Sequence, residues 1–290
     1  NNNSPEHADA AIQAVFDSGI RAVWAYGNAN DEWLPVSDVP QSRDVLRIAG
    51  QWFTGRDQLV TLALAARGPQ FATPEATVAD LTLAREADIP VTVHVGDGAW
   101  GRSRPLLWLA GHGFADERTT YVHCNTIADD EFDIIAATGG AVSIAPELEM
   151  HMGHGRLATL RARERGIPTG LSVDVCTSVG GDLFSAMRAI LAGTRYLPNI
   201  DALDAGIPLE PLPLRATDAL AMATRDGARV AWLADRVGVL APGLRADVIL
   251  VRGDTLAMRP LNVPAAAVVE SGHPGLVDTV FVDGVPVKRG

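Results

Sequence analysis

The chain has 290 residues, of which 47 % are hydrophobic and 20 % charged, and its formal net charge is −11. This composition lets the chain bury a large core, as one large domain or as a domain with a small appendage. It contains neither a basic run with interleaved aromatic residues nor a run near the ~18 apolar residues of a membrane helix, so no nucleic acid and no membrane is expected as a partner.

Short apolar runs alternate with helical patterns along most of the chain. Strands are expected at 21–27, 59–65, 91–95, 119–123, 141–145 and 170–173. Helices are expected at 5–17, 41–53, 74–87, 104–111, 129–138, 157–165 and 183–192. This alternation is typical of an α/β protein with a parallel sheet covered by helices.

These six strand–helix units are two fewer than a closed eight-stranded barrel contains. The sequence after Asp174 is helical and then antiparallel in character, so the two missing units are expected upstream of Asn1. We therefore predict a TIM-like (β/α)8 barrel that lacks its first two strands, over residues 1–234.

The sequence pattern changes after residue 235. Apolar runs at 246–251, 277–282 and 285–287 predict a small β-module with no helix of its own over residues 235–290. Asp283-Gly284 separates the last two runs, and this dipeptide is favoured in two-residue hairpin turns.

Three polar residues stand at the C-terminal ends of predicted strands. They are His94, His123 and Asp174, each preceded by a β-branched apolar run. In a parallel α/β barrel these ends share one mouth, where the chemistry is done. Two imidazoles and a carboxylate meeting there suggest a metal-dependent hydrolase.

An ordered set of short motifs runs nearly from end to end of the chain. Its pieces are His94–Asp97, Val122–Asn125, Ser143–Glu149, Ser172–Asp174, Ala223-Thr224 with Gly227–Arg229, and Gly238–Gly243 with Ala246-Asp247. With this set the chain resembles the amidohydrolase superfamily, specifically its branch of cytosine deaminases and chlorohydrolases (ATZ/TRZ type).

The resemblance implies a distorted barrel with a β-sandwich built from both chain ends, of which 235–290 would be the C-terminal part. It also implies one divalent metal, zinc or alternatively iron, held by a His-x-His pair on the first strand, by His94 on the fifth and by Asp174 on the eighth. His123 would orient the substrate or the attacked water, or add a ligand to the metal.

Two departures from the family pattern affect this site. None of the seven histidines belongs to a His-x-His pair. Asp97 stands where related deaminases usually carry a glutamate as proton shuttle. Because the His-x-His pair is missing, we expect little or no activity from these 290 residues alone.

Metal-bound water would supply hydroxide at neutral pH. Asp97 or Asp174 could then move its proton to the leaving nitrogen, and His123 could stabilise negative charge on the substrate. The residues expected to contact substrate are Trp100, Arg102, Glu147, Glu149 and His151. Together with His154, the last three could also hold a second metal, although a polar lining of the mouth is the preferred interpretation.

We therefore predict a metal-dependent hydrolase that cleaves C–N bonds of a cyclic or aromatic small molecule, by deamination. The alternatives are a catalytically impaired small-molecule-binding barrel and a lyase-type or metal-free enzyme of the same superfamily. The family often forms homodimers, so a second copy is a candidate partner. With only two cysteines and no signal peptide at its start, the chain is expected to be cytoplasmic.

Overall fold

The computed structural model describes residues 4–28, 36–55 and 57–290. Its main sheet contains β1 (Ala22–Tyr26), β2 (Val60–Ala66), β3 (Val91–Val95), β4 (Thr119–His123), β5 (Ala141–Ile144) and β6 (Thr169–Leu171). All neighbours in this sheet are parallel and follow the order of the sequence. The six predicted strands are therefore confirmed to within two residues at either end.

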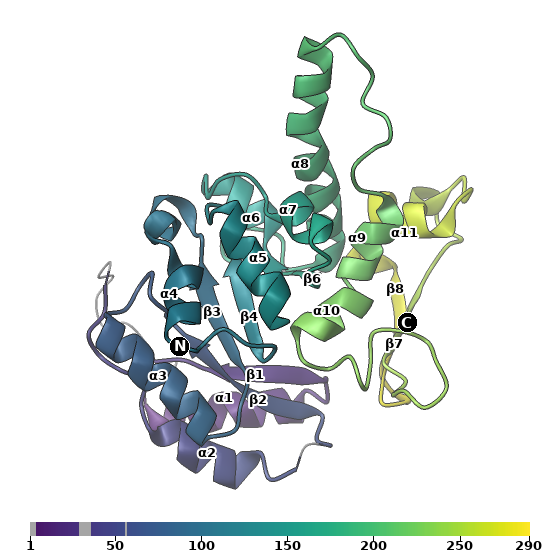
Figure 1. The fold of residues 1–290 in the computed structure, drawn as a ribbon. Helices are drawn as coiled ribbons and strands as arrows, with labels where there is room; N and C mark the ends of the chain where they lie inside the picture. The colour runs from purple at the N-terminus through teal and green to yellow at the C-terminus, as the bar shows by residue number, and fades with distance from the viewer. Residues whose placement is uncertain (1–3, 29–35, 56) are drawn as a thin grey trace.

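Helices connect the successive strands and cover the outside of the sheet (Figure 1). They are α1 (Pro5–Asp17), α2 (Asp44–Trp52), α3 (Pro74–Glu86), α4 (Pro105–Gly111), α5 (Asp129–Thr138), α6 (Pro146–His151), α7 (Thr159–Glu164), α8 (Leu183–Asp204), α9 (Ala216–Met222), α10 (Arg225–Val230) and α11 (Pro264–Ser271). Short 3₁₀ turns occupy Gly98–Ser103, Leu256–Met258 and Pro274–Leu276. This order is that of a partial TIM barrel, as the sequence predicts.

Local sequence signals start several of these helices. The Ser4 side chain accepts a hydrogen bond from the backbone of His7 at the start of α1, and Thr73 does the same for Ala76 at the start of α3. In both helices a proline occupies the first turn, where its missing N–H costs nothing. Such caps contribute about 1 kcal/mol each and fix where the helices begin.

The core lies between the sheet and the helices that cover it. Its fully buried large side chains include Ile12, Ile48, Leu64, Leu106, Leu109, Tyr121, Phe132, Ile135, Ile144 and Ile190. Burying each such side chain contributes roughly 1.5–3 kcal/mol. The core thus holds the strands that carry the polar residues of the mouth.

Helix α8 is longer than its sequence predicts. The expected helix ends at Ala192, but α8 continues past Pro198 to Asp204 and extends away from the rest of the molecule (Figure 1). Its later part is anchored by Arg195, whose guanidinium donates to the Leu214 backbone oxygen at 2.6 and 3.0 Å. This contact with a returning segment is tertiary, and the local helix-ending signals do not reveal it.

A second, antiparallel sheet follows, made of β7 (Val248–Val251), β8 (Val277–Val282) and β9 (Val285–Arg289). The predicted hairpin turn is confirmed, with φ of 53° at Asp283 and 78° at Gly284. The expectation of no helix in this region is wrong, because α11 lies between β7 and β8. Helix α11 buries Val269 and packs against α8 and α9, so it belongs to the helical layer beside the barrel.

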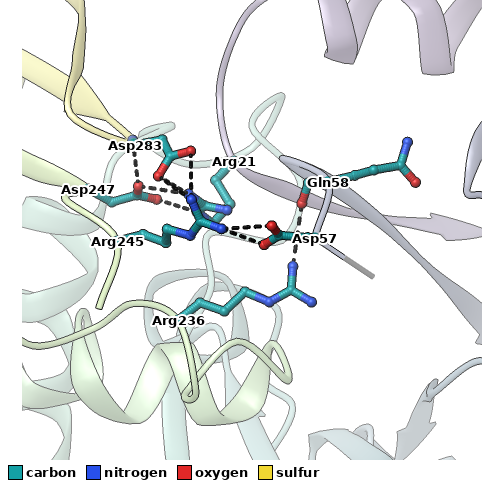
Figure 2. A network of polar contacts seen from close by, with 7 residues as sticks. All are labelled: Arg21, Asp57, Gln58, Arg236, Arg245, Asp247 and Asp283. Carbon is teal, nitrogen blue, oxygen red and sulfur yellow. Dashed lines mark hydrogen bonds and ion pairs between the residues drawn. The ribbon is translucent and has the colours of Figure 1, made fainter. Parts of the chain in front are cut away.

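A polar network joins the small sheet to the N-terminal ends of β1 and β2 (Figure 2). Arg21 donates to both carboxylate oxygens of Asp247, at 2.6 and 3.1 Å. Arg245 contacts Asp57 at 2.6 Å and Asp283 at 3.3 Å. Because the mouth of a barrel lies at the opposite strand ends, this network serves stability. Within the described residues, no helix is both long and apolar enough to cross a membrane.

Candidate functional site

The three polar residues expected at strand ends lie at one edge of the main sheet. His94 belongs to β3, His123 ends β4 and Asp174 follows β6. The ring centroids of His94 and His123 are 5.4 Å apart. His123 Nε2 lies 3.8 Å from Asp174 Oδ2. The fold thus brings all three side chains into one mouth.

The chain leaves β4 and β6 through left-handed backbone. The φ angle is 72° at His123, 59° at Cys124 and 59° at Asp174. Non-glycine residues adopt this conformation at a cost of about 1–3 kcal/mol each, and such residues cluster at functional sites. After the turn Cys124 is fully buried, and burial raises the pKa of its thiol well above the usual value. It is therefore an uncharged core residue, whereas Cys176 is exposed.

His123 is held from behind by Glu149. The His123 ring is buried, and its Nδ1 lies 3.0 Å from Glu149 Oε1. The same carboxylate accepts hydrogen bonds from Asn125 Nδ2 at 2.8 Å and from the backbone of Ala145 at 2.9 Å. Burial disfavours a charged ring, but the hydrogen bond and charge of Glu149 outweigh it and raise the pKa of His123. With Nδ1–H donated to Glu149, Nε2 of His123 is the atom that faces the mouth.

Asp97 and His154 face each other beside His123. Asp97 Oδ1 is 2.8 Å from His154 Nδ1, and both residues are buried. Neither atom has a correctly oriented hydrogen-bond partner among the described residues. The rings of His154 and His123 meet edge to face with centroids 5.5 Å apart. One ligand atom each from Asp97, His123 and His154 lies within 4.8 Å of the others, and the described residues contain no other such group of three.

His94 forms the more open side of the mouth. Its ring meets Phe71 edge to face at 5.8 Å, and Phe71 in turn lies 6.1 Å from the Trp100 ring. The surrounding protein atoms and the neighbouring His123 lower the pKa of His94, which favours the neutral ring that a metal requires. Trp100, 57 % exposed, and Arg102 lie on the 3₁₀ turn Gly98–Ser103 beside this wall.

The predicted substrate contacts after β5 separate once the helix is formed. Glu147, Glu149 and His151 all belong to α6, where residues two apart face different directions. Glu149 points into the core behind His123, whereas His151 is exposed and Glu147 is half-buried. His154, which follows α6, does reach the mouth and lies beside Asp97. From the sequence alone, His154 was expected to act together with Glu147, Glu149 and His151.

Comparison with known proteins adds family evidence to this geometry. The sequence matches the model of the amidohydrolase family over residues 1–287. It is 27 % identical over 289 residues to a 5-methylthioadenosine/S-adenosylhomocysteine deaminase of Symbiobacterium thermophilum, covering 96 % of this chain and 64 % of the relative. Identity and coverage are the same for a 5'-deoxyadenosine deaminase of Methanothermobacter thermautotrophicus.

Two solved structures show the same fold. An adenosine deaminase from Xanthomonas campestris with bound zinc superposes with a TM-score of 0.79 at 24 % identity, over 100 % of this chain and 65 % of that one. Atrazine chlorohydrolase TrzN from Arthrobacter aurescens, complexed with zinc, gives a TM-score of 0.80 at 24 % identity, over 98 % of this chain and 64 % of that one. The chain therefore spans a little under two thirds of the length of these proteins.

Proposed function

The chain belongs to the amidohydrolase family, and from this we propose that its protein is a metal-dependent hydrolase that cleaves a C–N bond of a cyclic or aromatic small molecule by deamination. The names of the two curated relatives favour an aminopurine nucleoside as substrate. The observation that carries the proposal is the convergence of His94, His123, Asp174 and the buried Asp97 on one mouth.

The donor groups in the mouth fit a divalent metal. Neutral imidazole and carboxylate are the ligand types of catalytic zinc and iron sites. His123 Nε2 lies 3.8 Å from Asp174 Oδ2, and the His94 ring lies beside the His123 ring, so donor groups of these types face one another in the mouth. In the proposal His94 and Asp174 hold the metal, zinc or alternatively iron, with the His-x-His pair expected upstream. When bound, the metal would lower the pKa of water and supply hydroxide at neutral pH.

The chain's own residues would carry the remaining steps. Nε2 of His123, with its ring fixed by Glu149, faces the mouth and would stabilise negative charge that develops on the substrate ring. Asp97 would take a proton from water and deliver it to the leaving nitrogen. Trp100 beside Phe71 provides an aromatic surface on which a planar base could stack, and Arg102 lies on the same turn.

Four further expectations are part of this proposal. Residues 1–234 would form the barrel and 235–290 the C-terminal part of the β-sandwich. The protein would work in the cytoplasm, and a homodimer is its expected assembly. The 290 residues alone would show little turnover, because the His-x-His pair is not among them.

The test is ammonia release by the protein, in its longest native form and as the 290-residue chain, with a panel of aminopurine nucleosides, aminopyrimidines and aminotriazines. We expect the longest form to deaminate at least one aminopurine nucleoside, to lose activity with a chelator and to regain it with zinc. Turnover that survives complete metal removal would favour the lyase-type or metal-free alternative. Ligand binding without turnover across the panel would favour the catalytically impaired binding barrel.

A further inference from the structure

Three side chains in the mouth are arranged as ligands of a cation other than the one expected at His94 and Asp174. We propose that Asp97, His123 and His154 form a second divalent-metal site, and that an ion bound there inhibits the enzyme. All three residues are buried, and their ligand atoms lie within 4.8 Å of one another. Two imidazoles and one carboxylate, with positions left for water, are a donor set that suits zinc.

Asp97 and His154 place two ligand atoms side by side in the mouth. The 2.8 Å between Oδ1 and Nδ1 is short enough for a hydrogen bond, but neither atom has a correctly oriented partner among the described residues. Around a tetrahedral ion, two ligand atoms each ~2.1 Å from the metal lie roughly 3.4 Å apart. The Asp97 and His154 side chains would therefore have to move apart by about 0.6 Å to admit an ion between them.

The third ligand is already oriented. Because Glu149 accepts the Nδ1–H of His123, the lone pair of Nε2 is available to a metal once any proton on it is released to solvent. A carboxylate behind a histidine is the usual support of a metal-bound imidazole, since it fixes the ring and raises its basicity. Glu149 is itself held by Asn125 and by the backbone of Ala145, so this support is rigid.

The consequence of binding rests on the proposed function. An ion at this site would occupy Nε2 of His123 and Oδ1 of Asp97. These are the atoms that the deamination needs for stabilising charge and moving a proton. Occupation and turnover therefore exclude each other, and excess metal inhibits the enzyme while trace metal activates it.

Metal counting tests the site without relying on activity. The protein, loaded by equilibrium dialysis against zinc, is compared with His154→Ala and Asp97→Asn. The control is His151→Ala, which removes an exposed histidine near the same loop. We expect His154→Ala and Asp97→Asn each to lose one bound equivalent and His151→Ala to lose none. Glu149→Gln should weaken binding at the site about 10–100-fold.

Cobalt gives a second measurement, because its visible absorption reports a protein-bound ion with nitrogen ligands. We expect the cobalt absorption of His154→Ala to be lower, by the contribution of one bound ion, than that of the protein and of His151→Ala. Circular dichroism and thermal melting establish that each variant is folded. If His154→Ala is unstable, His154→Gln, which keeps roughly the size of the side chain, is used in its place. Unchanged zinc stoichiometry and cobalt spectrum in folded His154 and Asp97 variants would overturn the proposal.

Inhibition is measured separately on the active form. Zinc added beyond the first equivalent should lower the turnover rate of the protein. As a fraction of each protein's own rate without added zinc, the loss should be much smaller in His154→Ala. Equal inhibition of both would overturn the inhibitory role. If no substrate is turned over, the proposed function fails, whereas the metal counts still decide whether the site exists.

Discussion

Asp80 carries a buried carboxylate whose protonation should be visible in the stability of the fold. It lies on α3 with no exposed surface, and its Oδ1 accepts the backbone N–H of Gln41 at 2.6 Å. Its Oδ2 has no hydrogen-bond partner among the described residues. Burial raises the pKa of Asp80 from 3.8 to about 6, against smaller lowering effects of the Gln41 hydrogen bond and the Arg67 charge.

The sign of the pH dependence follows from this raised pKa. Between about pH 4 and 6 the folded chain keeps a proton on Asp80 that the unfolded chain has lost. The contribution of Asp80 to the free energy of unfolding therefore falls by about 1.4 kcal/mol per pH unit in this window, and by about 3 kcal/mol in all. Asp80→Asn keeps the shape and the acceptor oxygen but cannot titrate. The stability of Asp80→Asn relative to the parent should thus rise by about 2.5 kcal/mol from pH 4 to pH 7.

Urea unfolding followed by tryptophan fluorescence at several pH values measures this difference. The parent and Asp80→Asn share every other titrating group, so their effects cancel in the comparison. A relative stability that changes by less than about 1 kcal/mol over this range would refute the reasoning, because it would mean that the carboxylate is as well solvated in the fold as in the unfolded chain.

Two further predictions compare matched positions by the same urea assay. Arg21→Met breaks the largely buried pair with Asp247 and should cost about 3 kcal/mol, whereas Arg43→Ala breaks an exposed pair and should cost less than about 1 kcal/mol; equal losses would contradict the role given to burial. Gly101→Ala would place its Cβ 2.1 Å from a backbone atom and should destabilise by about 1–3 kcal/mol. Gly50→Ala, in α2 with nothing within 4 Å, should stabilise by roughly 0.5–1 kcal/mol.

The strands and the position of the mouth could be predicted because they depend on local patterns. A buried parallel strand is a short apolar run, and the residue that ends it necessarily lies at the C-terminal edge of the sheet. His94, His123 and Asp174 are therefore found where the sequence indicates. The length of α8 could not be predicted, because the contact between Arg195 and the Leu214 backbone joins segments whose approach no local signal encodes.

The details of the site depend on tertiary packing in the same way. In the sequence, Glu149, His151 and His154 are neighbouring polar residues, and nothing in the pattern indicates which of them faces the mouth. One turn of helix followed by a loop sends Glu149 behind His123, leaves His151 exposed and brings His154 to Asp97. Periodicity could have separated Glu149 from His151 had α6 been expected. The approach of His154 to a residue that follows a different strand could not be foreseen.

The order of the main sheet has a consequence for handling the protein. A closed barrel has no edge, but within the described residues β1 pairs with β2 alone and leaves one side of its backbone N–H and C=O groups unpaired. This strand reads Ala-Val-Trp-Ala-Tyr and carries neither a charge nor a proline, the usual safeguards against edge-to-edge pairing. Wherever β1 is left uncovered, it is a template for aggregation, so solubility during expression depends on what covers that edge.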